Sequence, residues 1–496
     1  MHGCVIRRST LGMLLLAAAG LLTAPAVLAQ SQKQEIDLLK KQLEEMRQRD
    51  EKTKQQLEEL QRRLEGLQSQ PPAQEKAPAD KLEEAVQELP KAPTPPTTLA
   101  PALASQRLGG VTLRLIDLSL DVLAGAGGST VGDEELQRLE GGDHDPRKNG
   151  FTLQNVELSL AGAIDPYFTG ETHLVFFVDP ANGDTTVEME EAFLTTTGLP
   201  FGLQVKAGFF FTEFGLMNPT HPHAWHWQDQ PIINTRVFGP DGMRQAGLRV
   251  GWFLPVPWSS ELLLGAQNAN GEIMASFLAN EEFFGERPIG GRPFVARSVT
   301  GPQDLVYLVR WVNFWNLRDD VGAQLGGSAV FGPNASGPDG RTTIYGGDLK
   351  VRWRPGNHFR GWPFLLWESE IIRRDYKADS FDGSDPTGNP LTLPAQTLHD
   401  WGVYTQLLYG FSYGWAAGVR VEYASGSGAS VGGRAADPFR NDRYRVSPLL
   451  VWHPSEFSRL RLQYNYDRAD HLTQRDAHTV WLGLEFLYGA HPAHKY

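Results

Sequence analysis

The chain has 496 residues, of which 41% are hydrophobic and 10% aromatic, and it carries a formal net charge of −12. Its longest wholly apolar run lies at the N-terminus, so no helix of roughly 20 apolar residues follows, and an α-helical membrane protein is excluded. Acidic and basic residues balance over residues 1–104, so the net negative charge belongs to the remainder, which argues against a nucleic-acid partner.

Residues 1–29 are expected to be a signal peptide. Two arginines precede a short apolar core over 11–22, and small or tolerated residues before Gln30 form a fair cleavage site. The alternative is an N-terminal membrane anchor, against which the short core and the cleavage site both argue. The chain's one cysteine, Cys4, lies inside this segment, so the mature chain would have no disulfide or thiolate chemistry.

Residues 30–70 show a heptad pattern with glutamate, lysine, arginine and glutamine outside the seam. The apolar positions are Ile36, Leu39, Leu43, Met46, Leu57, Leu60, Leu64 and Leu67. A strict 3.5-residue period needs a partner helix, so a coiled coil that joins identical subunits is expected; a lone solvated helix is the alternative. Residues 71–108 are rich in proline, which a packed helix interior does not accept, and are predicted to be a linker.

Over residues 109–488 the hydrophobic period changes to two. Aromatic and aliphatic side chains at 460, 462, 464 and 466 alternate with polar ones, and the same pattern recurs around 248–252, 345–354 and 415–422. Alternation alone is typical of any half-buried sheet. Here the polar rows are heavily charged and tyrosine or tryptophan closes the apolar rows, as expected where strands cross a membrane interface.

The connections between these segments alternate between short and long. Tight turns fall at 165–167, 199–201, 254–257, 412–414 and 454–456, whereas long polar stretches fall near 125–150, 212–244, 268–303, 378–397 and 427–440. This asymmetry is typical of an outer-membrane barrel with short periplasmic turns and long outer loops. Strands are expected to begin near Val111, Phe151, Phe168, Val187, Leu203, Gln245, Ser259, Asp304, Val321, Thr343, Pro363, Leu398, Trp415, Asp442, Ser458 and Ala477.

The predicted fold class is therefore all-β membrane: an antiparallel transmembrane β-barrel of about 16 strands, preceded by a short periplasmic α-helical coiled coil. Residues 489–496 are expected to be a periplasmic tail. A soluble sandwich or propeller is the alternative fold. A TonB-driven receptor would need about 22 strands and a globular plug, which 30–108 does not resemble.

One block of the sequence resembles a known family. Segment 187–193, VEMEEAF, leads through a turn to segment 203–215, LQVKAGFFFTEFG. Together they resemble the "EEAY … L-x-V-R-x-G-x-F-x-x-P-F-G" block of the phosphate-selective porin O and P superfamily, whose N-terminal coiled coil is also similar. The resemblance is close over residues 150–215. Over the rest of the chain, only the spacing of the predicted strands is similar. Thr212-Glu213 departs from the usual segment ending in proline, and no dense lysine cluster is present, so phosphate selectivity is not implied.

The C-terminal residues 489–496, GAHPAHKY, resemble the tails of outer-membrane proteins labelled zinc-regulated receptors. A plainer interpretation is a terminal aromatic residue suited to recognition by the barrel-assembly machinery.

The long stretch 212–244 is expected to fold into the barrel and narrow it, as the third loop does in porin-like barrels. Its candidate constriction residues are Glu213, His221, His223, Trp225, His226, Trp227 and Asp229. Three histidines within six residues make a candidate metal site of His221, His223 and His226, since imidazole suits zinc or copper. Packing of the loop against the wall is the alternative.

Charged positions on the polar rows are the candidate pore lining. They are Lys206, Arg249, Lys350, Arg352, Arg354, Arg420, Arg445, Arg459 and Arg461, with Glu157, Glu191, Glu368, Glu370 and Glu422. The mixed signs leave the selectivity open.

The sequence therefore predicts a porin of the Gram-negative outer membrane for passive diffusion of small hydrophilic solutes or ions, homotrimeric through its coil and barrel walls and contacting outer-membrane lipid. A zinc-linked, TonB-associated receptor and a tether to the cell wall are the alternatives. No catalytic motif was found and no cofactor is expected.

Overall fold

The computed structural model describes residues 105–489, except 109–110, 115, 180–182, 386–387, 429–430 and 432–436. The predicted signal peptide, the coiled coil over 30–70, most of the linker and the tail after Gly489 lie outside the described residues. The described residues all belong to one unit of the chain, Thr98–Tyr496. Among them, no helix has the length and apolarity to cross a membrane.

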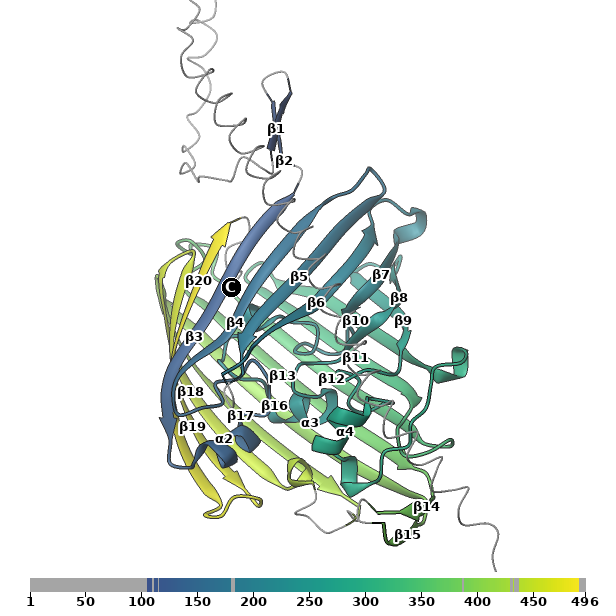
Figure 1. The fold of residues 1–496 in the computed structure, drawn as a ribbon. Helices are drawn as coiled ribbons and strands as arrows, with labels where there is room; N and C mark the ends of the chain where they lie inside the picture. The colour runs from purple at the N-terminus through teal and green to yellow at the C-terminus, as the bar shows by residue number, and fades with distance from the viewer. Residues whose placement is uncertain are drawn as a thin grey trace, which may run out of the picture. The chain divides into compact units, whose positions relative to one another are not determined.

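Sixteen antiparallel strands form a closed barrel (Figure 1). Each pairs with the next along the chain, and the last pairs with the first through Thr479–Gly489 and Ser119–Ser129. The strands are β3 (Asp117–Ser129), β4 (Gly150–Ala163), β5 (Phe168–Val178), β6 (Thr185–Thr196), β7 (Leu203–Phe211), β8 (Arg244–Phe253), β9 (Ser259–Asn268), β10 (Leu305–Arg318), β11 (Val321–Pro333), β12 (Arg341–Trp353), β13 (Phe364–Ala378), β16 (Gln396–Ser412), β17 (Trp415–Ser427), β18 (Arg443–Ser455), β19 (Ser458–Ala469) and β20 (Asp476–Gly489). The predicted fold class of about sixteen antiparallel strands is confirmed.

The first strand differs from the expectation. Val111–Arg114 (β2) pairs with Ser105–Leu108 (β1) in a separate hairpin, and the barrel begins at Asp117 instead. Alternating apolar residues occur in both segments, so the period alone does not say which one joins the barrel. A second small hairpin, β14 (Phe381–Ser384) with β15 (Pro390–Leu393), lies in the long connection between β13 and β16.

The long connections at one end of the barrel carry the helices, and α3 and α4 are drawn within the ring of strands (Figure 1). The helices are α2 (Asp133–Leu139), α3 (Ile232–Phe238) and α4 (Glu281–Glu286), with 3-10 turns η2 (Pro200–Gly202), η3 (Pro222–Ala224), η4 (Ile289–Gly291), η5 (Pro302–Asp304) and η7 (Pro438–Arg440). Helix α3 contacts β13, β16 and β17, although it belongs to the connection between β7 and β8. The connection therefore reaches across the interior of the barrel.

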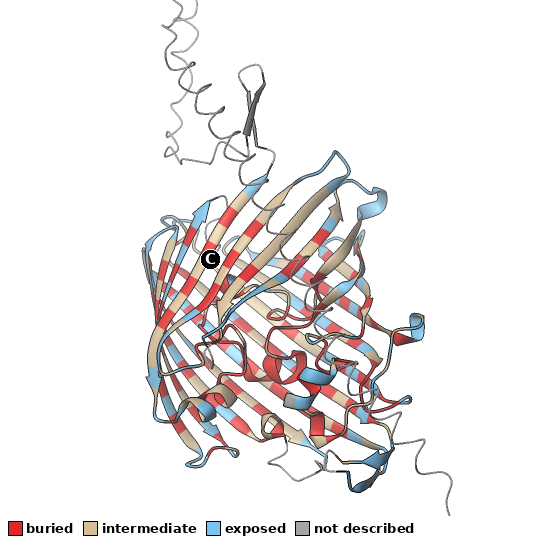
Figure 2. Ribbon diagram, viewed as in Figure 1, coloured by how far each residue is buried: buried red, intermediate tan, exposed pale blue. Residues whose placement is uncertain are grey.

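Side chains alternate between buried and exposed along many of the strands, most regularly along β13, β16 and β20 (Figure 2). On β20, Leu482 and Leu484 are 50% and 44% exposed, whereas Trp481 and Glu485 on the alternate row are fully buried. The exposed rows are therefore apolar and the buried rows include charges, which is the reverse of a soluble sheet. Aromatic residues close the exposed rows, as where Trp415 stacks on Trp452 across β17 and β18.

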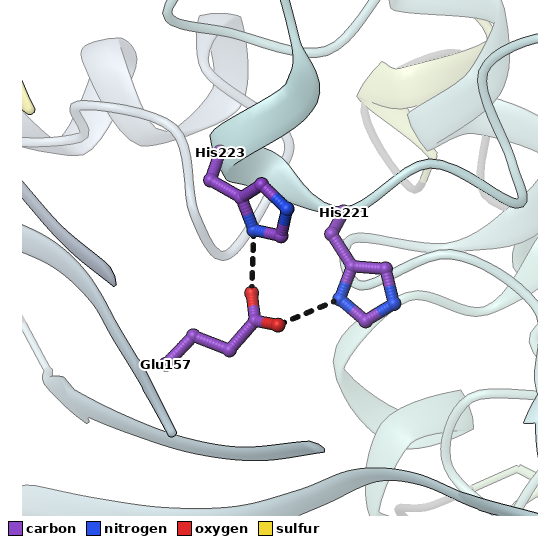
Figure 3. Close-up of side chains that lie close together, drawn as sticks. All are labelled: Glu157, His221 and His223. Carbon is purple, nitrogen blue, oxygen red and sulfur yellow. Dashed lines mark hydrogen bonds and ion pairs between the residues drawn. The ribbon is translucent and has the colours of Figure 1, made fainter. Parts of the chain in front are cut away.

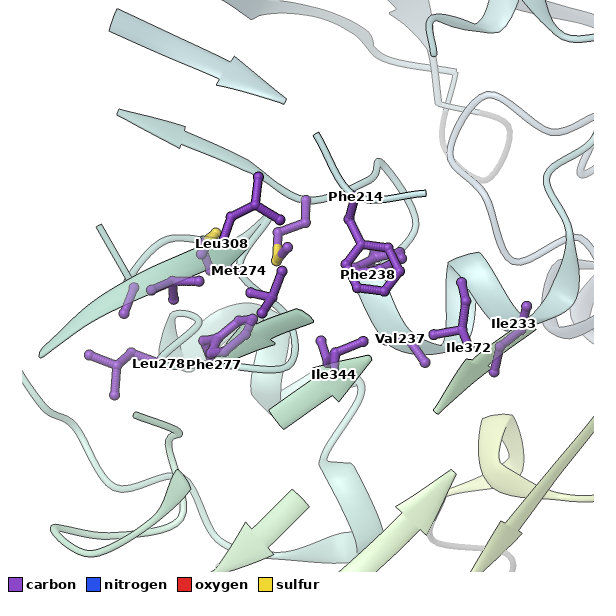
Figure 4. Packing of buried hydrophobic residues seen from close by; sticks show 14 of the residues in the cluster. Phe214, Ile233, Val237, Phe238, Met274, Phe277, Leu278, Leu308, Ile344 and Ile372 are labelled. Carbon is purple, nitrogen blue, oxygen red and sulfur yellow. The ribbon is translucent and has the colours of Figure 1, made fainter. Parts of the chain in front are cut away.

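The interior also contains an apolar core, which the sequence did not lead us to expect. Phe214, Phe238, Met274 and Phe277 from the connections pack against inward side chains of β10 to β16 (Figure 4). The wall residues of this core are Leu308, Val330, Ile344, Ile372 and Tyr404. Inward apolar positions on these strands thus hold the inserted connections in place by removing apolar surface from water.

Candidate functional site

Residues 212–243 connect β7 to β8, and this connection bends inward into the barrel directly after β7. We call it the inserted segment. Gly215 makes this turn with a φ of +64°, and a Cβ placed on it would lie 1.5 Å from Glu370 Oε1 of β13. The neighbouring Leu216 N donates to the same carboxylate oxygen over 3.3 Å. Only glycine suits a positive φ at such close approach, so this residue allows the segment to contact the wall.

Arginines on the far wall hold the backbone of this segment. Arg461 on β19 donates to the carbonyl oxygens of Trp225 and Trp227, over 3.1 and 3.0 Å. Arg459 donates to the carbonyl of His223 over 2.8 Å, also from β19. Buried carbonyls that leave a regular strand need donors, and the inward arginines supply them.

Asp229 is the most densely bonded residue of the segment and is fully buried. Its carboxylate accepts from Arg420 and Arg445, from Gln463 Nε2 over 2.8 Å and from Asn465 Nδ2 over 2.9 Å. Burial alone would raise the pKa of Asp229, but the two guanidinium groups outweigh it and hold that pKa well below its usual range. Asp229 is therefore a charged residue that holds the segment against β17, β18 and β19.

Two histidines of the same segment contact carboxylates on another part of the wall, on β4 and β6. His223 Nδ1 lies 2.8 Å from Glu157 Oε2, and His221 Nδ1 lies 3.3 Å from Glu157 Oε1 (Figure 3). His221 also lies 2.8 Å from Glu190 through Nδ1 and 2.8 Å from Glu191 through Nε2. Burial would lower the pKa of His221, but the carboxylates of Glu190 and Glu157 raise it well above its ordinary value.

His226 does not join this cluster. Its Nε2 lies 3.7 Å from Glu368 on β13, and burial is the main cause that lowers its pKa to about 4. The structure thus brings His221 and His223 together with Glu157, and places the third histidine of the predicted trio against another strand. Pro222 opens the 3-10 turn η3, which orients His221 and His223 toward one carboxylate.

The other predicted lining residues fall into two groups. Arg420, Arg445, Arg459, Arg461, Glu157, Glu191, Glu370 and Glu422 are buried against the inserted segments. Lys206 and Glu213 pair over 2.7 Å with 15% and 16% of their side chains exposed, and Lys350 is 40% exposed beside Glu368. Arg249, which is buried, also contacts Glu213; Arg352 is exposed, and Arg354 is half-buried. Water therefore reaches the inward charges mainly on the walls from β7 to β12.

The two tryptophans of the segment serve its packing. Trp227 Nε1 donates to the carbonyl of Ser447 over 2.9 Å, and its ring packs with Leu408 and Leu449 of the wall. Trp225 Nε1 donates to the carbonyl of Thr220, within its own segment, over 2.8 Å.

Some buried ionic residues had not been singled out in the sequence. Arg374 and Arg440 both pair with Asp400, and Glu140 from the connection 130–149 pairs with Arg445. Arg374 lies four residues beyond Glu370 on β13, so the period of two would have identified it as inward. No sequence pattern ties Glu140 to Arg445, which is 305 positions away.

No family model matches the chain. Among solved structures, the outer membrane channel DcaP of Acinetobacter baumannii is 11% identical, with a TM-score of 0.47 over 75% of this chain and 97% of that one. OprB of Pseudomonas putida is 11% identical, with a TM-score of 0.46 over 75% and 94%. The anion-selective porin from Comamonas acidovorans is 9% identical, with a TM-score of 0.44 over 75% and 99%.

A relative in Aquifex aeolicus (strain VF5), described as an uncharacterized protein, is 30% identical over 410 residues. The alignment covers 77% of this chain and 80% of that protein. The chain therefore belongs to the same protein family as this Aquifex aeolicus relative.

Proposed function

We propose that this protein is an outer-membrane porin through which small hydrophilic solutes or ions diffuse passively, and that the segment 212–243 narrows its lumen. One observation carries the proposal: a closed barrel of sixteen strands has apolar and aromatic side chains on its outer face and charged ones on its inner face. A lipid-facing apolar band around a polar interior is the arrangement of membrane barrels that conduct. A barrel of about 16 strands is wide enough to hold an aqueous lumen.

We place the solute path between the inserted segment and the walls from β5 to β12. On the opposite side, Arg420, Arg445 and Asp229 form buried ion pairs that leave no room for bulk water. On the proposed side, the partly exposed charges include Glu171, Lys206, Glu213 and Lys350, together with the exposed Arg352. Charges of both signs along one narrow path favour hydrated, polar solutes over apolar ones.

The positive pair Lys350 and Arg352 supplies a direct test. Both lie on the inward row of β12, two residues apart. A unit charge about 8 Å from a passing ion in water contributes about 0.5 kcal/mol, which is roughly a twofold change in local ion concentration. In planar bilayers, the variant Lys350→Gln/Arg352→Gln should conduct in discrete steps. Because it removes two charges, the local cation concentration should rise by about fourfold, and the reversal potential in a salt gradient should shift toward cations.

Arg373→Gln is the matched control, because Arg373 lies on β13 with 46% of its side chain exposed and pairs with Asp375 on the outer row. Its reversal potential should equal that of the wild type. Absence of conductance steps in the wild-type protein would overturn the porin proposal, and equal shifts in both variants would overturn the assignment of the inner row.

A homotrimer is part of the same proposal. The heptads of residues 30–70 lie outside the described residues, and they offer each subunit a helix that needs partners.

A further inference from the structure

We propose that Glu157, His221 and His223 form a binding site for a divalent transition-metal ion of the zinc class, which fastens the inserted segment to the barrel wall. The inference concerns a property separate from conduction, and it does not depend on the porin proposal. The three side chains come from β4 and from the turn around η3, so an ion there would join a strand to the segment that crosses the lumen (Figure 3).

The geometry suits a small ion. One nitrogen or oxygen atom from each of the three residues lies within 4.8 Å of the others. The Nδ1 atoms of His221 and His223 lie 3.3 and 2.8 Å from the Glu157 oxygens. Ligand atoms about 2.0–2.1 Å from a tetrahedral zinc ion are separated by roughly 3.3 Å, so the side chains need only small movements to enclose one.

Carboxylates around the three residues supply a second, independent observation. Glu190 is 1% exposed, and the close neighbour of its carboxylate is the His221 ring, whose Nδ1 lies 2.8 Å away. Asp121 on β3 is 2% exposed, its two carboxylate oxygens have no hydrogen-bond donor in the described part of the chain, and it lies within electrostatic range of His223 and Glu157. Buried carboxylates without donors are costly unless a cation is present.

The charges that face the cluster favour a cation. The acidic groups near the imidazoles are Asp121, Glu157, Glu190 and Glu191, while Arg459 and Lys206 are the nearby fixed positive groups. His173 on β5 also faces the cluster, with its Nδ1 2.9 Å from Glu157 Oε1, so a bound ion would share that carboxylate with a third imidazole. Arg459 is also bonded to Glu485. An ion bound by two neutral imidazoles and Glu157 would displace the protons that now lie between these groups. The Glu190 carboxylate, beside His221, would supply the fourth ligand.

The donor atoms determine the class of ion. Two imidazole nitrogens with carboxylate oxygens suit zinc and neighbouring transition metals, whereas calcium and magnesium prefer oxygen atoms alone. The same side chains without a metal would hold the segment by imidazolium–carboxylate pairs. The two arrangements differ in metal content, so the choice between them is measurable.

The test uses the tag-free full chain folded in detergent, stripped with EDTA and titrated with zinc chloride by calorimetry, with bound zinc counted by mass spectrometry. About one equivalent of zinc per chain is expected. His223→Gln and Glu157→Gln should each weaken binding by at least tenfold to a hundredfold. His226→Gln is the matched control from the same segment and should bind like the wild type, since His226 lies beside Glu368.

Two further variants keep the result interpretable. His223→Cys should restore binding and give a thiolate-to-metal charge-transfer band with Co²⁺, which a purely structural histidine would not produce. His491→Gln/His494→Gln removes the histidines of the C-terminal segment and should leave the stoichiometry unchanged. Circular dichroism shows which variants are folded. No zinc retained by the folded wild type, or equal losses in His226→Gln and His223→Gln, would overturn the proposal.

Discussion

Asp229 of the inserted segment pairs with two buried arginines of the wall, and its replacement tests how firmly that segment is held. Asp229→Asn leaves Arg420 and Arg445 buried with one carboxylate fewer. Removing one partner of a buried pair costs about 3–5 kcal/mol. We expect Asp229→Asn to lower the free energy of unfolding by about 3 kcal/mol, the low end of this range. The reason is that Arg420 still pairs with Glu422 and Arg445 still pairs with Asp467.

Urea titration in lipid vesicles, followed by tryptophan fluorescence, measures this loss. The control Asp470→Asn removes a carboxylate 3.6 Å from Arg475, in a pair whose side chains are 31% and 62% exposed. Exposed pairs contribute about 0–1 kcal/mol, so little change is expected there. Equal effects of the two substitutions would contradict the anchoring role of Asp229.

Single residues of the site were predictable only in part. The histidines were visible because they lie close together in the sequence, but nearness in sequence also grouped His226 with them. Glu157 is 66 positions from His223, and its inward position on β4 is what brings it to the ring. The two-residue alternation along β4 predicts that Glu157 faces inward. It does not predict which side chain of the inserted segment will contact Glu157.

At the scale of elements, the short and long connections were read correctly, because tight turns and polar stretches differ strongly in composition. The apolar residues on the inner rows of the strands were not predicted from the sequence. Ile344 and Ile372 face inward against Phe214 and Phe238, and their residue types are those of a lipid-facing row. Sequence period separates the two faces of a strand but cannot say what covers an inward apolar face until the connections are placed.

The entry of the inserted segment into the barrel depends on Gly215. In Gly215→Ala, the new Cβ would meet the Glu370 carboxylate and would have to hold a φ near +64°. The expected cost is about 1–3 kcal/mol, with the Leu216 hydrogen bond to Glu370 lost. The segment should then become more susceptible to proteolysis, and single-channel current should fluctuate more.

Gly327→Ala on β11 is the control, since nothing lies within 4 Å of its Cβ position and its φ is not in the left-handed region. It should leave both proteolysis and current unchanged. If Gly215→Ala also left them unchanged, the turn at Gly215 would not be what directs the segment against the wall.

The whole molecule is arranged for a bilayer only if its exposed apolar rows contact lipid, and β20 offers a test of that arrangement. Leu482 and Leu484 are half-exposed neighbours on the outer row, next to the seam where β20 closes on β3. A lysine at the midplane of a membrane barrel costs about 2–4 kcal/mol, falling to about 0–1 near the interfaces. Leu482→Lys should therefore lower the unfolding free energy in vesicles by about 2–4 kcal/mol.

Glu456→Lys places the same side chain in the short turn between β18 and β19, where it is exposed at the end of the barrel. It should fold with the stability of the wild type, because a charge in water is not desolvated. The difference between the two variants isolates the effect of depth from that of the lysine itself. A Leu482→Lys protein as stable as Glu456→Lys would mean that the outer row meets water, and the proposed membrane barrel would then have to be abandoned.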